Sequence, residues 1–154
     1  MNKIVQSVGF MTAVFAVFGI ALGILSFISG SWAQSQLITD AGGATEFGPV
    51  FIAVVYLQIA IVIFLLGPVI AALTAGIFGR VLAQPKLALV AGGFTSLIGF
   101  YIMASIALVF LVLSKGTEAQ QALSFTQALF PMLVAGIPTA IMGSLISALS
   151  AAVN

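Results

Sequence analysis

The placement of the charged side chains constrains this chain more than any other feature. The seven charged residues occupy four short regions, at Lys3, at Asp40 and Glu46, at Arg80 and Lys86, and at Lys115 and Glu118. Four charge-free stretches lie between or beyond them, at residues 4–39, 47–79, 87–114 and 119–154. Each stretch exceeds the roughly 20 apolar residues with which a helix crosses the hydrocarbon core of a bilayer.

The composition leads to the same conclusion. Hydrophobic residues make up 62% of the 154 positions and charged residues 5%, whereas a soluble domain has about 25% charged residues. Much of the surface must therefore face lipid or other copies of the chain. Lipid requires backbone polar groups to be paired within each segment, which favours helices. We predict an all-α fold with hydrophobic transmembrane-type helices at residues 4–29, 49–78, 87–113 and 125–153.

We expect these helices to form one hydrophobic domain over residues 1–154, built as two tandem antiparallel hairpins at 4–78 and 87–153. Residues 30–48 are expected to form a polar loop in which Trp32 anchors at the membrane interface.

Lys3 and the apolar run that follows it could be confused with a signal peptide. The run is longer than the roughly 7–15 apolar residues of such a peptide, so we expect it to be retained.

The basic residues predict an orientation. If all four helices span, Lys3, Arg80 and Lys86 share one side, and the three acidic residues lie with Lys115 on the other. The positive-inside tendency then places both termini and the 79–86 turn on the cytoplasmic or interior side.

A faint internal repeat relates the two halves. Gly9-Phe10-Met11-Thr12 resembles Gly93-Phe94-Thr95-Ser96, and Pro68 and Pro138 each interrupt the second helix of a predicted hairpin. Duplication of a hairpin and coincidence between low-diversity sequences both explain the likeness. The two prolines predict kinks in their helices.

Small residues recur along one face of three helices. They are Thr12, Ala16, Gly19, Gly23 and Ser26 in the first helix, Gly92 and Gly99 in the third, and Gly136, Ala140, Gly143 and Ser147 in the fourth. Such seams predict close helix packing, within one subunit or between subunits.

We expect the large phenylalanines of the first three helices to face lipid or neighbouring copies: Phe10, Phe15, Phe18, Phe27, Phe51, Phe64, Phe94, Phe100 and Phe110.

Reactive side chains are scarce. The chain has no histidine and no cysteine, and its three carboxylates lie between the predicted helices. These residues predict neither a metal cluster nor a catalytic triad, so we expect no enzyme activity, no cofactor and no small-molecule substrate. Gln58 is the polar residue of most interest, because it predicts a hydrogen bond between helices or, alternatively, the lining of a narrow pore.

Two resemblances to known families bear on function. Ala83-Gln84-Pro85-Lys86 resembles the polar loop of the proteolipid rotors of rotary ATPases, which are also duplicated hairpins. That family requires a carboxylate at mid-membrane, where this chain offers only Ser96, Gly99 or Tyr101. The departure argues against an ion-carrying rotor.

Gly48-Pro49-Val50-Phe51 opens a helix after a Ser/Thr/Gly-rich segment, and Leu66-Gly67-Pro68-Val69 interrupts the same helix. Over residues 5–78 this pattern resembles the hydrophobic major coat proteins of spindle-shaped archaeal viruses. This chain departs from them in having two hairpins. The resemblance implies a self-assembling structural protein in a virion shell or membrane, with copies of itself and lipid or apolar neighbours as partners.

In such an assembly, Lys3, Arg80 and Lys86 would recur on an interior face. There they could contact DNA without sequence specificity, by counterion release. For a single copy, positive-inside topology is the simpler explanation of these three residues. The alternative function is an oligomeric channel or transporter, or a small accessory subunit of a membrane complex.

Overall fold

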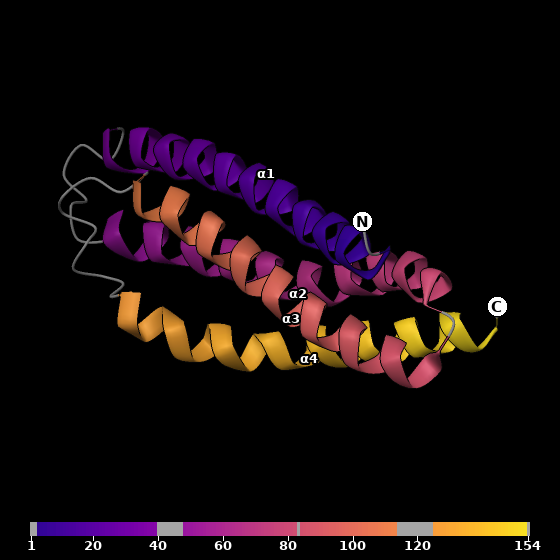
Figure 1. The fold of residues 1–154 in the computed structure, drawn as a ribbon. Helices are drawn as coiled ribbons and strands as arrows, with labels where there is room; N and C mark the ends of the chain where they lie inside the picture. The colour runs from indigo at the N-terminus through magenta and orange to yellow at the C-terminus, as the bar shows by residue number, and fades with distance from the viewer. Residues whose placement is uncertain (1–2, 40–47, 83, 114–124, 154) are drawn as a thin grey trace.

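The computed structural model describes residues 3–39, 48–82, 84–113 and 125–153. These residues form four α-helices and no strand (Figure 1). The helices are α1 (Lys3–Thr39), α2 (Gly48–Val81), α3 (Pro85–Leu113) and α4 (Phe125–Ala152). The predicted all-α class is confirmed.

Helix α1 continues past the predicted end at residue 29, so the expected loop over residues 30–48 is wrong for residues 30–39. The polar residues that suggested a loop are accommodated by the helix itself. Ser29, Ser31 and Ser35 donate hydrogen bonds of 2.7–3.0 Å to carbonyls three or four residues earlier. Back-bonding of this kind lets serine remain inside a helix. Trp32 accordingly stands on the last third of α1.

Prolines begin two of the helices and lie within two. Pro49 is the second residue of α2 and Pro85 the first of α3, where the missing N–H would have no helical partner in any case. Helix α2 runs without a break through Pro68, and α4 runs through Pro131 and Pro138. The kinks expected at Pro68 and Pro138 stay predictions.

The helices pack as a four-membered bundle in which α1 and α4 are the outermost members. Helix α3 packs against both α1 and α4, α2 packs against α4 and less extensively against α1, and α2 touches α3 across the middle. Figure 1 shows α1 and α4 on opposite sides, with α2 and α3 between them. Because the main partner of α1 is α3, the two halves of the chain interlock.

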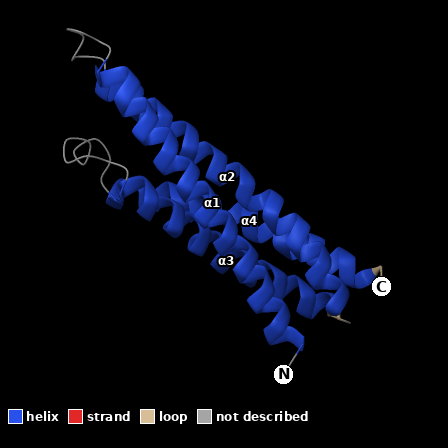
Figure 2. Ribbon diagram, turned by 90° about the horizontal axis from the view of Figure 1, so that it is seen from above, coloured by secondary structure: helices blue, strands red, loops and turns tan. Residues whose placement is uncertain are grey.

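Contacts along the helices give their directions. Phe15 lies against Gly99, and Gly19 lies against Met103, so α1 and α3 run parallel. The start of α1, the end of α4 and the turn between α2 and α3 all lie at one end of the bundle (Figures 1 and 2). We call this the basic end, because α1 begins with Lys3 and because Arg80 and Lys86 flank the turn.

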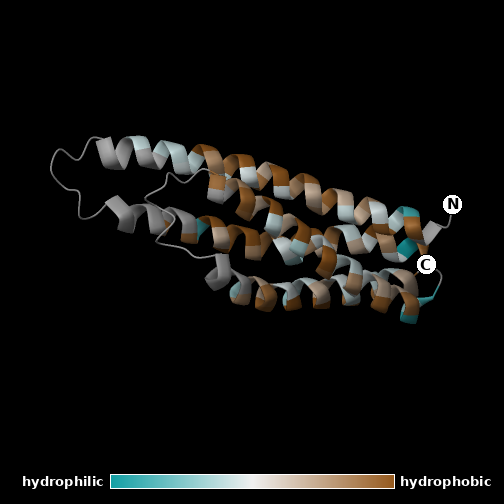
Figure 3. Cartoon of the chain, turned by 60° about the vertical axis from the view of Figure 1, so that its left-hand side comes forward, coloured by the Kyte–Doolittle hydropathy of each residue, from teal (hydrophilic) through white to brown (hydrophobic). Residues whose placement is uncertain are grey.

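The bundle has polar groups inside and apolar groups outside. Its buried polar residues are Ser26, Thr74, Thr95, Ser96, Thr139 and Ser147. Bulky apolar side chains are exposed on all four helices, which Figure 3 shows as hydrophobic colouring along the bundle. Four segments of the described residues are long and apolar enough to cross a membrane: Val5–Trp32, Leu57–Val81, Pro85–Phe110 and Phe130–Ala152. These helices are of transmembrane type, and the arrangement suits a membrane.

The tight contact at Gly19 generates a first prediction. A β-carbon at Gly19 would lie 2.9 Å from the α-carbon of Met103, so Gly19→Leu must push α1 away from α3. Overpacking of this kind costs about 1–3 kcal/mol. We expect that loss in the free energy of unfolding, measured by titrating the protein in mixed micelles with sodium dodecyl sulfate.

Gly9 provides the matched control on the same helix. Gly9 is exposed, and a β-carbon there would have nothing within 4 Å. Gly9→Leu should therefore leave the unfolding free energy close to that of the natural chain. Equal losses for the two variants would contradict the packing described at the α1–α3 interface.

Candidate functional site

Aromatic side chains of one helix fill the space above glycines of the next. Between α1 and α3 the relation is reciprocal, because Phe15 packs on Gly99 and Phe110 packs on Gly23. A methyl group on either glycine would overlap the opposing ring. The predicted Gly19/Gly23 seam of α1 thus lies in a contact within one chain, against α3.

Phe100 and Tyr101 extend this pattern to the other two helices. The Phe100 ring packs on Gly67 of α2, and the Tyr101 ring packs on Gly136 of α4. The two rings meet edge to face, with centroids 5.8 Å apart, an arrangement that favours aromatic pairs. Together they link α3 to α2 and α4.

The phenylalanines therefore do not share one environment. Phe15 and Phe100 are fully buried, which corrects the expectation that they face lipid or neighbouring copies. They are buried because glycines on the facing helices make room for their rings. Phe64 and Phe110 are half-buried, and the side chain of Phe51 lies outside the described residues. Those that are exposed are Phe10, Phe18, Phe27 and Phe94.

Serine and glycine alternate across the antiparallel α3–α4 interface. Gly92 lies against Ser147, and Gly143 lies against Ser96. All four residues are buried. The predicted seams of α3 and α4 therefore face each other, with Ala140 half-buried at their edge. On α1, Gly19, Gly23 and Ser26 are buried, while Thr12 and Ala16 are half-buried.

The buried hydroxyls differ in their hydrogen bonding. Ser26 and Thr74 donate to carbonyls of their own helices, at 2.6 and 2.7 Å. Among the described residues, Tyr101 Oη donates between helices to the Leu133 carbonyl at 3.3 Å, and Ser150 Oγ donates between helices to the Gly76 carbonyl at 2.6 Å. Ser96 and Ser147 are buried with no hydrogen-bond partner for their hydroxyls.

Gln58 does not lie between the helices of one chain. Its side chain is exposed on α2, about three turns from the start of that helix. The interhelical hydrogen bond and the pore lining predicted for Gln58 both stay predictions. Among the described residues, Tyr101 and Ser150 make polar contacts between helices.

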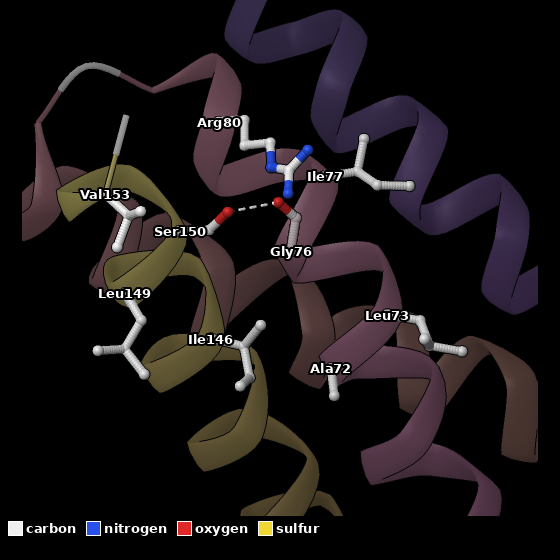
Figure 4. Close-up of a pocket in the computed structure, with 9 residues that line it drawn as sticks. All are labelled: Ala72, Leu73, Gly76, Ile77, Arg80, Ile146, Leu149, Ser150 and Val153. Carbon is white, nitrogen blue, oxygen red and sulfur yellow. Dashed lines mark hydrogen bonds between the residues drawn. The ribbon is translucent and has the colours of Figure 1, made fainter.

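A groove runs between α2 and α4 at the basic end of the bundle (Figure 4). It has a volume of about 630 Å³. Arg80, Ser150 and Gly76 gather at one end of it in Figure 4, and apolar side chains line the remainder. The lining residues are Ala72, Leu73, Gly76, Ile77, Arg80, Ile146, Leu149, Ser150 and Val153.

A smaller groove of about 330 Å³ lies between α1 and α2 near the same end. It is lined by Gln6, Ser7, Phe10, Met11, Ile77, Phe78 and Val81, with no charged side chain among them. Of these two grooves, only the one between α2 and α4 combines an apolar channel with a cation.

The predicted basic residues lie at the basic end but on different helices. Arg80 and Lys86 are exposed on α2 and α3, and Lys3 begins α1, its side chain lying outside the described part. Among the described residues, no three histidine, cysteine or carboxylate side chains come together as they would around a metal ion.

Comparison with known proteins gives no match for this chain. The chain matches no protein-family model, no curated protein and no solved structure. The resemblance to spindle-shaped virus coats therefore stays a prediction, as does the argument against an ion-carrying rotor.

Two serines of α4 that differ in their hydrogen bonding generate a second prediction. Ser150→Ala removes a hydrogen bond between α4 and α2 and should lower the free energy of unfolding by about 0.6–1.7 kcal/mol. Ser147→Ala removes a hydroxyl that has no partner, so it should cost less than about 0.5 kcal/mol. Detergent unfolding curves of both variants test this, and a larger loss for Ser147→Ala would contradict the assignment.

Proposed function

We propose that this protein is a self-assembling structural protein whose copies build a hydrophobic, membrane-like layer. The observation that carries the proposal is the apolar surface that surrounds the bundle. Bulky apolar side chains are exposed along all four helices, over the same segments that are long enough to span a bilayer. Such a surface is stable only against lipid or against similar surfaces.

The outermost helices provide the contact faces. Helices α1 and α4 each have 28% of their most apolar window buried, compared with 39% for α2 and 44% for α3. Three large rings project from α1, at Phe10, Phe18 and Phe27. Aromatic side chains contribute strongly to protein contacts because each covers a large area. The α1 face is therefore the surface through which neighbouring copies would meet.

The most specific form of this proposal is a virion coat, as the resemblance over residues 5–78 implies. Copies aligned in one direction would present Lys3, Arg80 and Lys86 together on one surface. Repeated positive charges of this kind bind DNA by releasing its counterions. DNA bound by reconstituted arrays should then dissociate as salt concentration rises, and binding that is indifferent to salt would contradict this form of the proposal.

The α1 face generates a third prediction. The triple variant Phe10→Ala, Phe18→Ala, Phe27→Ala removes exposed rings and should leave the bundle folded. It should weaken association between copies by at least about tenfold, as expected when more than about 1.4 kcal/mol of contact is lost. Fluorescence transfer between labelled copies in liposomes, at varied protein-to-lipid ratio, measures the association.

The control removes apolar groups of equal or greater exposure from a helix between the outer two. This control is the triple variant Leu65→Ala, Val69→Ala, Leu73→Ala, which alters exposed positions of α2 and should leave association nearly unchanged.

Electron microscopy of arrays or of native membranes gives a second readout. A continuous lattice of this chain alone supports the proposal. A closed ring with a polar lumen favours a channel, and a stoichiometric second chain favours an accessory subunit.

A further inference from the structure

We propose that the groove between α2 and α4 receives the Phe10 ring of a second copy, so that each copy docks α1 into the groove of the next. This contact rests on the proposed function, because it is the means by which the copies would assemble. Three observations point to it: an open space beside Gly76, the depth of Phe10 along the bundle, and the exposed area of the chain.

Gly76 has open space beside it in the groove. Inside the bundle, aromatic rings pack on glycines of facing helices, as Phe15 does on Gly99. At Gly76 the nearest neighbour of a β-carbon would be a methyl group of Ile146, at 3.7 Å. The groove that Gly76 lines has a volume of about 630 Å³, whereas a cavity of about 150 Å³ is enough for benzene. The groove therefore has room for a phenyl ring seated on Gly76.

Phe10 lies at the same depth in the bundle as Gly76. Phe10 and Ile77 line the smaller groove between α1 and α2, and Ile77 follows Gly76 in the chain. Two copies inserted in the same direction therefore bring Phe10 of one level with Gly76 of the other. The next exposed ring of α1, Phe18, lies about 12 Å deeper. That is beyond the end of the groove at Ala72, which is about 6 Å from Gly76.

The ring and the groove lie on different parts of the bundle. Phe10 is 53% exposed on α1, the groove lies between α2 and α4, and α1 and α4 are on opposite sides (Figure 1). A contact between two different patches leaves a pair of copies with one patch of each kind unused. Further copies add there, and a row or a closed ring results according to the rotation between neighbours.

The exposed area of the chain suits two such contacts per copy. The chain exposes 9029 Å², whereas a soluble monomer of the same 15.8 kDa exposes about 7,300 Å². Each partner contributes about 800 Å² to a standard interface, so two contacts would leave about 7,400 Å² exposed. One ring buries only about 150–250 Å². Side chains of α1 around Phe10 must therefore share in the contact.

A pair of substitutions tests the seat on Gly76. Phe10→Ala removes the ring and Gly76→Leu occupies the groove, so each should weaken association between copies in liposomes about tenfold. Because both act on one contact, the double variant should also lose about tenfold, whereas independent sites would lose about a hundredfold. Fluorescence transfer between labelled copies, at varied protein-to-lipid ratio, measures these losses.

Two controls accompany these variants. Phe18→Ala with Phe27→Ala removes two rings that lie deeper than the groove, and it should weaken association less than Phe10→Ala does. Leu73 also lines the groove, but Leu73→Ala shortens a side chain and leaves the seat on Gly76 open, so it should have little effect. A detergent unfolding curve like that of the natural chain would show that Gly76→Leu folds.

Disulfide cross-linking measures the register between copies and does not depend on Gly76→Leu. The chain has no cysteine, so an introduced cysteine can react only with one on another copy. Gln6 lies one turn nearer the basic end than Phe10, and Val153 lines the groove at that end. Mixed copies with Gln6→Cys and Val153→Cys should form disulfide heterodimers on oxidation. Ile28→Cys, about 33 Å farther along α1 than Gln6, should not cross-link to Val153→Cys.

The outcomes separate this contact from the proposed function. Cross-linking of Ile28→Cys to Val153→Cys would show antiparallel copies, and disulfides only between Gln6→Cys copies would show contact of α1 with α1. Full association of Gly76→Leu would show that the groove holds lipid instead of a ring. Each of these results overturns the contact but retains assembly. Copies that stay monomeric at every protein-to-lipid ratio would overturn the proposed function as well.

Discussion

Close approach of helix backbones at glycine and serine is the interaction on which this bundle depends. Lipid surrounds apolar side chains as well as protein does, so burying them brings helices together only weakly. Dispersion attraction therefore has to come from dense contact. Phe15 on Gly99, Phe110 on Gly23 and Ser147 on Gly92 provide that contact in successive layers. The hydrogen bond from Ser150 to Gly76 adds a directional contact between α4 and α2.

The sequence predicts the number of helices and their apolar character, but it does not predict which helices pack against each other. Seven charges separated by long apolar stretches leave helices as the economical structure. The end of α1 escapes prediction because serine and glycine are turn signals in water yet remain helical here, each hydroxyl bonding its own backbone. Small residues on one face of a helix predict close packing there, but they do not indicate which helix packs on that face. The packing of Phe100 on Gly67 is therefore seen only in the structure.

The candidate site, too, is predictable from the sequence in part: its charged residue is, but the groove beside that residue is not. Arg80 is conspicuous in the sequence because the chain has few charged residues. The spacing of the predicted helices also indicates the end of the bundle at which Arg80 lies. The groove beside it requires α2 and α4 to lie together, although nearly half the chain separates Arg80 from Ser150. Gln58, the polar residue most conspicuous in the sequence, is exposed instead. A side chain's neighbours across a bundle depend on helix rotation, which a weakly amphipathic sequence does not specify.

The α1–α3 contacts have a consequence for how the molecule acquires its structure. Phe15 meets Gly99, and Gly19 meets Met103, at the offset in sequence that also separates Gly9 from Gly93. The first helix therefore gains its larger interface only once its parallel counterpart α3 has been synthesised, since α2 alone offers it a smaller one. The second half of the chain thus supplies the main surface on which the first half packs.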